Sequence, residues 1–124
     1  MRRGAAEPDV ALAVDHEHVD DGFRVDVRPD RDRVLVCPIG EIDLATAGAV
    51  EQPLLELLDQ GFGHVVVDLR AVTFLDSSGV RLLVVAHERA RRADARLSLI
   101  LGSTGSSRAL EISGLLDLLE VVDH

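Results

Sequence analysis

Apolar and polar residues alternate along the chain in a way that divides it into short strands and helices. Phe23, Val25 and Val27 alternate with charged residues, the pattern of a half-buried strand, and Val34–Ile39 is a second apolar run. The polar segment Arg28–Asp32 between them contains a proline and predicts a turn. The two runs are therefore expected to form an antiparallel hairpin.

Beyond this hairpin, helices and strands alternate. Strands are predicted at Val65–Leu69, Leu97–Leu101 and Leu118–Val122. Residues at helical spacing predict three helices, which contain Ala47, Val50, Leu54, Leu57 and Leu58, then Val80, Leu83, Val84, His87 and Ala90, then Leu110 and Ile112. Strands joined through single helices run parallel. The fold class is therefore α/β: a single domain with a mixed β-sheet, mostly parallel with an antiparallel first hairpin, and with helices packed on it.

The segment Val65–Ala90 combines a strand, a short turn at Arg70–Leu75 and a helix that begins at Asp76-Ser77-Ser78-Gly79. Asp and Ser at a helix start accept hydrogen bonds from the free N–H groups of the first turn. The same end carries partial positive charge and attracts phosphate. The segment therefore predicts a serine hydroxyl at the exposed, electropositive end of a helix, with Asp76 and Ser77 as capping residues.

Three motifs follow one another along the chain. Gly40–Asp43 reads GEID, Asp76–Gly79 reads DSSG, and Arg108–Leu115 reads RALEISGL. These motifs and the distances between them resemble the STAS family of anti-sigma factor antagonists, with its GE[LI]D loop, its D-S-[ST]-G motif and its late helix ending in a [ST]GL turn. The resemblance implies a STAS-like domain over residues 22–124. Residues 1–21 would be an acidic N-terminal tail, which we expect to be flexible.

The resemblance implies a regulator with no catalytic residues. An unphosphorylated antagonist of this family binds an anti-sigma factor with a kinase-type ATPase fold, which frees a sigma factor. The partner then phosphorylates the first serine of the DSSG motif, and the complex separates. In this chain that serine is Ser77, with Ser78 as the less favoured acceptor. The implied partner-binding residues are Gly40, Glu41, Asp43, Asp76, Ser77, Ser78, Gly79 and Val80.

Other interpretations of these residues stay open. Ser77 could simply cap a helix, and Gly40–Asp43 could form only a tight turn and, with Asp43 or Thr46, the cap of the next helix. The chain could also be a non-switching STAS accessory or scaffold subunit, in a stressosome-like assembly or a transport complex. The serine hydroxyl groups of the DSSG motif favour the phosphorylation switch, because a purely structural role needs no hydroxyl group at this place. Val80–Ala86 is almost entirely apolar, so part of that helix must be covered by a neighbour or presented to a partner.

A serine hydrolase is disfavoured, because its nucleophile needs a base within hydrogen-bonding reach. DSSG is not the G-x-S-x-G of a nucleophile elbow. His87 lies about three helical turns beyond Ser77. His64 precedes the strand that leads to the serine, so it is expected at the opposite edge of the sheet.

Composition excludes further classes. All thirteen basic residues are arginine, and the absence of lysine removes P-loop NTPases and Schiff-base enzymes. The net charge of −9 disfavours nucleic acid and favours a protein partner with basic residues at its interface. The one cysteine, Cys37, cannot form an internal disulfide and is expected to be a small buried hydrophobe.

No run approaches the roughly 20 apolar residues of a membrane span, and acidic residues interrupt the segment that a signal peptide would need. We expect a soluble, cytoplasmic protein, a monomer or weak dimer, with no cofactor and no membrane contact. His16 and His18 do not predict a metal site, because a flexible tail lacks the fixed geometry that a metal requires.

Overall fold

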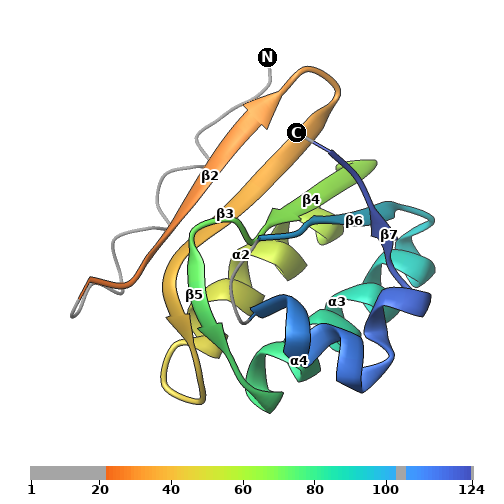
Figure 1. The fold of residues 1–124 in the computed structure, drawn as a ribbon. Helices are drawn as coiled ribbons and strands as arrows, with labels where there is room; N and C mark the ends of the chain where they lie inside the picture. Colours follow the sequence, from red (N-terminus) through yellow and green to blue (C-terminus); the bar gives the residue numbers. More distant parts are fainter. Residues whose placement is uncertain (1–21, 103–105, 124) are drawn as a thin grey trace.

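The computed structural model describes residues 22–102 and 106–123 (Figure 1). The expectations for the tail and for its two histidines concern residues outside these ranges. The described elements, in chain order, are β2 (Arg24–Asp30), β3 (Arg33–Ile42), α2 (Ala47–Asp59), β4 (His64–Asp68), β5 (Val72–Leu75), α3 (Ser77–Ala93), β6 (Arg96–Ile100), α4 (Ser106–Ser113), the 3₁₀ helix η2 (Leu115–Asp117) and β7 (Glu120–Val121).

The described strands form a six-stranded sheet in the order β2-β3-β4-β6-β7, with β5 paired to β3. Strands β2 and β3 are antiparallel, and the remaining pairs are parallel. This arrangement confirms the predicted mixed sheet with an antiparallel first hairpin. The late motif RALEISGL spans the end of α4 and the turn into η2, where Gly114 has a left-handed φ of 80°.

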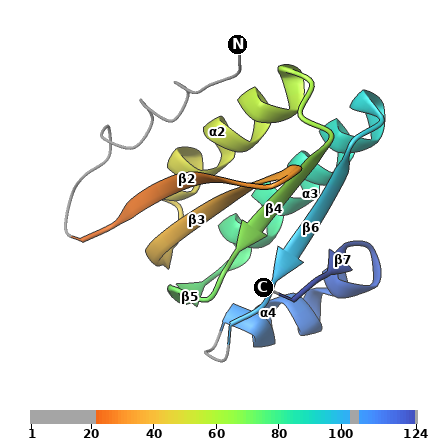
Figure 2. The same cartoon turned by 90° about the horizontal axis from the view of Figure 1, so that it is seen from above.

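The alternation of side chains along each strand decides which residues meet the helices. In β4, Val65 and Val67 belong to the main core, whereas Val66 packs in a smaller cluster on the other face. Figures 1 and 2 show α2 and α3 side by side against one face of the sheet. Cys37 belongs to the smaller cluster and is buried, as predicted, and this burial raises the pKa of its thiol.

The predicted hairpin turn was too long. Only Arg31 and Asp32 connect β2 and β3, and Arg31 adopts a left-handed φ of 64°. Residues 28–30 instead extend β2 and pair with β3. Pro29 fits there because β2 lies at the edge of the sheet, where a strand need not donate every N–H group.

Two predicted loops turned out to contain strand. Gly40, Glu41 and Ile42 end β3, and the predicted turn at residues 70–75 contains β5. The two segments pair in parallel, with a register shift after Gly40. The alternation of apolar and polar residues did not predict β5, because its buried residues, Val72 and Leu75, are separated by two exposed positions rather than one. This pairing joins the GEID segment directly to the DSSG segment.

Candidate functional site

The helix α3 begins with a side-chain cap. Asp76 is the N-cap residue, and its Oδ1 accepts a hydrogen bond of 2.8 Å from the backbone N–H of Ser78. The carbonyl of Asp76 accepts from the N–H groups of Gly79 and Val80. The N–H of Asp76 donates to the carbonyl of Ile42 at 3.2 Å, which ties the start of α3 to the end of β3.

The two serines of the motif differ in exposure. Ser77 is exposed, and its hydroxyl makes no hydrogen bond to another described residue. Ser78 is half-buried, and its N–H is used by the cap. The cap is therefore supplied by Asp76 alone, and the predicted capping role of the Ser77 hydroxyl was wrong. Exposure favours Ser77 as the serine that another protein can reach.

Gly79 and Val80 serve the packing of α3. Gly79 is buried, and a Cβ at this position would lie 2.5 Å from Cγ of Leu75. Glycine therefore allows the first turn of α3 to lie directly on β5. Val80 is half-buried and packs against the main core. Both residues hold the DSSG backbone in place and present little surface to a partner.

The end of β3 lies beside this helix start. Gly40 has a φ of 117°, in the range that favours glycine, and its N–H donates to the carbonyl of Ala71 at 3.1 Å. Glu41 is exposed and is the Cα partner of Phe74 in β5. The structure therefore brings the two predicted motifs to one edge of the sheet, although Glu41 and Ser77 are 36 positions apart in the sequence.

Asp43 organises the start of α2. Its Oδ1 accepts from the N–H groups of Ala45 at 3.0 Å and Thr46 at 3.2 Å. The Thr46 hydroxyl donates to the carbonyl of Glu41 at 2.8 Å and accepts from the N–H of Asp43 at 3.0 Å. Thr46 occupies the N-cap position but makes no side-chain cap bond itself. The capping role that the sequence suggested for this segment is thus carried by Asp43.

Two exposed apolar side chains lie next to the GEID and DSSG motifs in the sequence, and sequence reasoning missed both. Leu44, directly after Asp43, is 84% exposed, and Phe74, two residues before Asp76, is 48% exposed. Large apolar groups exposed close together are typical of a binding surface. The signal in the sequence was weak: Phe74 is one of three phenylalanines and breaks the alternation of its strand. We call Glu41, Leu44, Phe74 and Ser77 the DSSG edge.

The apolar side of α3 contributes less surface than the sequence suggested. Leu82, Leu83 and Ala86 are buried in the main core. Val84 is 39% exposed, against 1% for Leu83, so neighbouring positions do face opposite ways. Most of the excess apolar surface of this helix is therefore covered internally, and the larger exposed apolar groups lie on the loop and strand before the two helices.

The histidines do not join the site. His87 is half-buried on α3, ten positions after Ser77. His64 opens β4, and its Nε2 lies 2.9 Å from the hydroxyl of Ser98. Within residues 22–102 and 106–123 there is no group of three side chains that could hold a metal ion. No helix in the same ranges is long and apolar enough to cross a membrane.

Residues 24–124 match the family model of the STAS domain. The anti-sigma-B factor antagonist of Listeria monocytogenes serovar 1/2a is 34% identical over 93 residues, which cover 74% of this chain and 81% of the relative. The crystal structure of an anti-sigma factor antagonist from Mycobacterium paratuberculosis is similar with a TM-score of 0.76 at 24% identity, covering 86% and 90% of the two chains. The phosphorylated Bacillus cell fate determinant SpoIIAA gives a TM-score of 0.62 at 20% identity, covering 82% and 92%.

Proposed function

Because the chain belongs to the STAS domain family and resembles its anti-sigma factor antagonists, we propose that it binds an anti-sigma factor and that phosphorylation of Ser77 ends this binding. The anti-sigma factor in this proposal is a serine kinase with a kinase-type ATPase fold. Its capture frees a sigma factor. The chain itself is a binding protein and a phosphate acceptor.

One observation carries this proposal: the exposed Ser77 hydroxyl stands at the capped end of α3, three residues after the exposed side chain of Phe74. Buried apolar anchors supply most of the binding energy of protein interfaces. Phe74 and Leu44 are suited to this role because water covers them in the free chain. A partner that buries them also lies over Ser77. The same partner is therefore placed to phosphorylate that hydroxyl.

Phosphorylation changes the charge at the centre of this surface. The Ser77 oxygen forms a bond to the γ-phosphorus of ATP, the bond to the β–γ bridging oxygen breaks, ADP leaves, and the hydroxyl proton passes to a base of the kinase. The product carries about 1.5 to 2 more negative charges than serine at neutral pH. The end of α3 tolerates this charge in the free chain. A partner that binds here must remove water from the phosphate beside Asp76. This desolvation is unfavourable, so the complex weakens.

The test uses purified anti-sigma factors encoded by the genome that carries this chain, with ATP and peptide mapping. We expect phosphate on Ser77 of the wild-type chain. The Ser77→Ala variant should bind the same anti-sigma factor and take up no phosphate. Phosphate found only on Ser78 would overturn the assignment of Ser77. Tight binding without phosphate on either serine would overturn the switch and favour a non-switching STAS subunit.

A further inference from the structure

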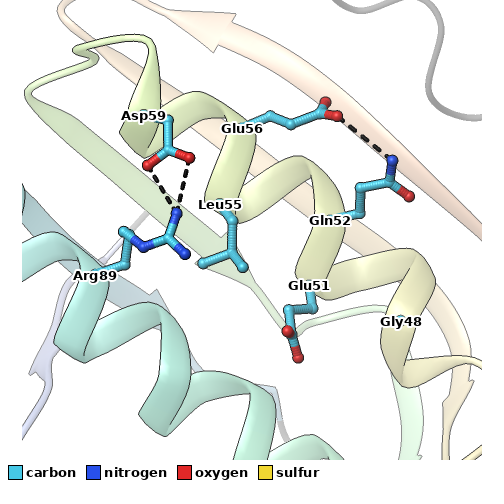
Figure 3. A pocket seen from close by; sticks show the side chains of 7 residues that line it. All are labelled: Gly48, Glu51, Gln52, Leu55, Glu56, Asp59 and Arg89. Atoms are coloured by element: carbon cyan, nitrogen blue, oxygen red, sulfur yellow. Dashed lines mark hydrogen bonds and ion pairs between the residues drawn. The ribbon is translucent and has the colours of Figure 1, made fainter.

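A groove of about 410 Å³ lies between α2 and α3 (Figure 3). Asp59 of α2 and Arg89 of α3 point toward each other at one end, where Nη1 of Arg89 donates to both carboxylate oxygens at 2.7 and 2.8 Å. Leu55 and Glu51 extend from α2 on the same side as Asp59 (Figure 3). Gly48 marks the other end. The groove therefore has the apolar side chain of Leu55 in its middle and an ion pair at one end.

The charges in the groove are not balanced. Arg89 pairs with Asp59, so it does not neutralise a second carboxylate. Glu51 is half-buried and forms no hydrogen bond or ion pair with any other described residue. Glu56 and Gln52 also line the groove, and the Gln52 amide, which is neutral, donates to Glu56 at 3.4 Å (Figure 3). The groove thus holds two uncompensated carboxylates, and Glu51 is the one that is half-buried, one helical turn from Leu55.

An apolar surface with a carboxylate beside it fits a basic side chain. Lys and Arg pack their methylene groups on apolar surface and keep their charged ends near a polar partner. Leu55 is half-buried and lies one helical turn from Glu51, so it offers the apolar contact at the right distance.

The groove opens at the DSSG edge. The ion pair joins residue 59 to residue 89, and each of these lies twelve positions after the first residue of its helix. At about 1.5 Å per residue, the two neighbouring helices therefore begin at the same level. Gly48 in the first turn of α2 is consequently level with the first turn of α3, which carries Ser77. One partner can cover both features.

We propose that this groove receives a lysine or arginine side chain of the anti-sigma factor that binds the DSSG edge. The proposal rests on the proposed function and adds a specificity contact to it. The space around Gly48 at this end of the groove is open, because a Cβ at this position would meet no atom within 4 Å. The net charge of −9 favours a basic partner in general. In this proposal Glu51 is the residue that a basic side chain of the partner contacts.

The test compares four variants with the wild-type chain, using the purified anti-sigma factor in titration calorimetry at low and high salt. One of them, Ser77→Asp, imitates the phosphorylated serine and should weaken binding through the switch alone. Gly48→Leu fills the mouth of the groove and should weaken binding at least about ten-fold, although it should raise the thermal midpoint by removing a helical glycine. Glu51→Gln should weaken binding about three- to ten-fold and reduce its salt dependence. Glu111→Gln removes the same charge from an exposed position of α4 outside the groove and should stay within about two-fold of wild type.

The outcomes separate this proposal from the function on which it rests. If Gly48→Leu and Glu51→Gln bind like wild type while Ser77→Asp binds more weakly, the groove lies outside the interface and the antagonist function stands. Equal losses from Glu51→Gln and Glu111→Gln would mean that only overall charge matters, and would overturn the groove contact. Failure of the wild-type chain to bind the anti-sigma factor would overturn both proposals.

Discussion

The starts of α2 and α3 are built from similar parts that are connected differently. Each helix follows a strand of the β3–β5 pair and is preceded by an aspartate and an exposed apolar side chain. At α2, the Thr46 hydroxyl is hydrogen-bonded both to the carbonyl of Glu41 and to the N–H of Asp43. At α3, the Asp76 carboxylate makes the cap bond and leaves the Ser77 hydroxyl without a described partner.

This difference shows which hydroxyl group is available for chemistry. A kinase that modified Thr46 would have to break the hydrogen bonds of this hydroxyl to Glu41 and Asp43 and open the loop that begins α2. Modification of Ser77 breaks no described hydrogen bond, because Asp76 satisfies the helix start by itself. The cap bond of α3 thus does not involve the Ser77 hydroxyl. This hydroxyl can therefore react while the start of the helix stays intact.

The largest effect is expected from the apolar side chain next to each helix start. Phe74→Ala should weaken binding of the anti-sigma factor by about 2 kcal/mol or more, and Leu44→Ala by about 1–2 kcal/mol, because both lose an apolar contact at the proposed interface. Calorimetric titration measures these losses. Ile112→Ala is the matched control, since Ile112 is 79% exposed on α4. Equal weakening by this control would show that no apolar contact is specific to the DSSG edge.

Replacing the glycine in the first turn of α2 and of α3 by alanine should change the free energy of unfolding in opposite directions. Gly79→Ala places a Cβ against Leu75 and should lower the free energy of unfolding by about 1–3 kcal/mol through overpacking. Gly48→Ala meets open space and should raise it by about 0.5–1 kcal/mol, the usual gain for replacing a helical glycine. Urea unfolding of both variants measures the difference. A destabilised Gly48→Ala would contradict the open geometry of the α2 start.

The helix starts could be predicted from the sequence because their determinants are local. An aspartate before apolar residues at helical spacing predicts the cap at Asp76, and the bond to Ser78 spans only two positions. The pairing of β5 with β3 was not predictable in this way. It joins Gly40 to Val72, and no pattern within either segment specifies the other.

The binding surface was missed for the same reason. Phe74 would be an ordinary buried residue in a regular strand, and its exposure follows from the register in which β5 meets β3. The groove between α2 and α3 likewise brings together residues far apart in the sequence, since Asp59 and Arg89, which pair at one end of it, are 30 positions apart. Local periodicity identified both helices, whereas the space between them depends on their packing.

The two capping aspartates should differ moderately in their contribution to stability. Asp43→Ala should cost about 1–2 kcal/mol, because its Oδ1 accepts from the N–H groups of Ala45 and Thr46. Asp76→Ala should cost about 0.5–1.5 kcal/mol, because one N–H group loses its partner. Thermal and urea unfolding give both values. Asparagine at either position retains an acceptor oxygen and should recover most of the loss, and failure to do so would show that charge, not capping, is important.

The smallest effect on stability is expected from Ser77→Asp, which tests whether the α3 start tolerates charge where the α2 start would not. A carboxylate in the first turn gains about 0.3–1 kcal/mol from the helix dipole. Repulsion from the neighbouring Asp76 opposes this gain, so the free energy of unfolding should stay within about 0.5 kcal/mol of wild type. Both contributions are screened by salt, and urea unfolding should therefore show little difference between low and high ionic strength.

The comparison variant is Thr46→Asp. Its free energy of unfolding should fall by about 1–2 kcal/mol, since its carboxylate cannot donate to the carbonyl of Glu41. A loss of that size in Ser77→Asp would mean that position 77 is not free to accept a phosphate, because the fold could not accommodate even one additional charge there.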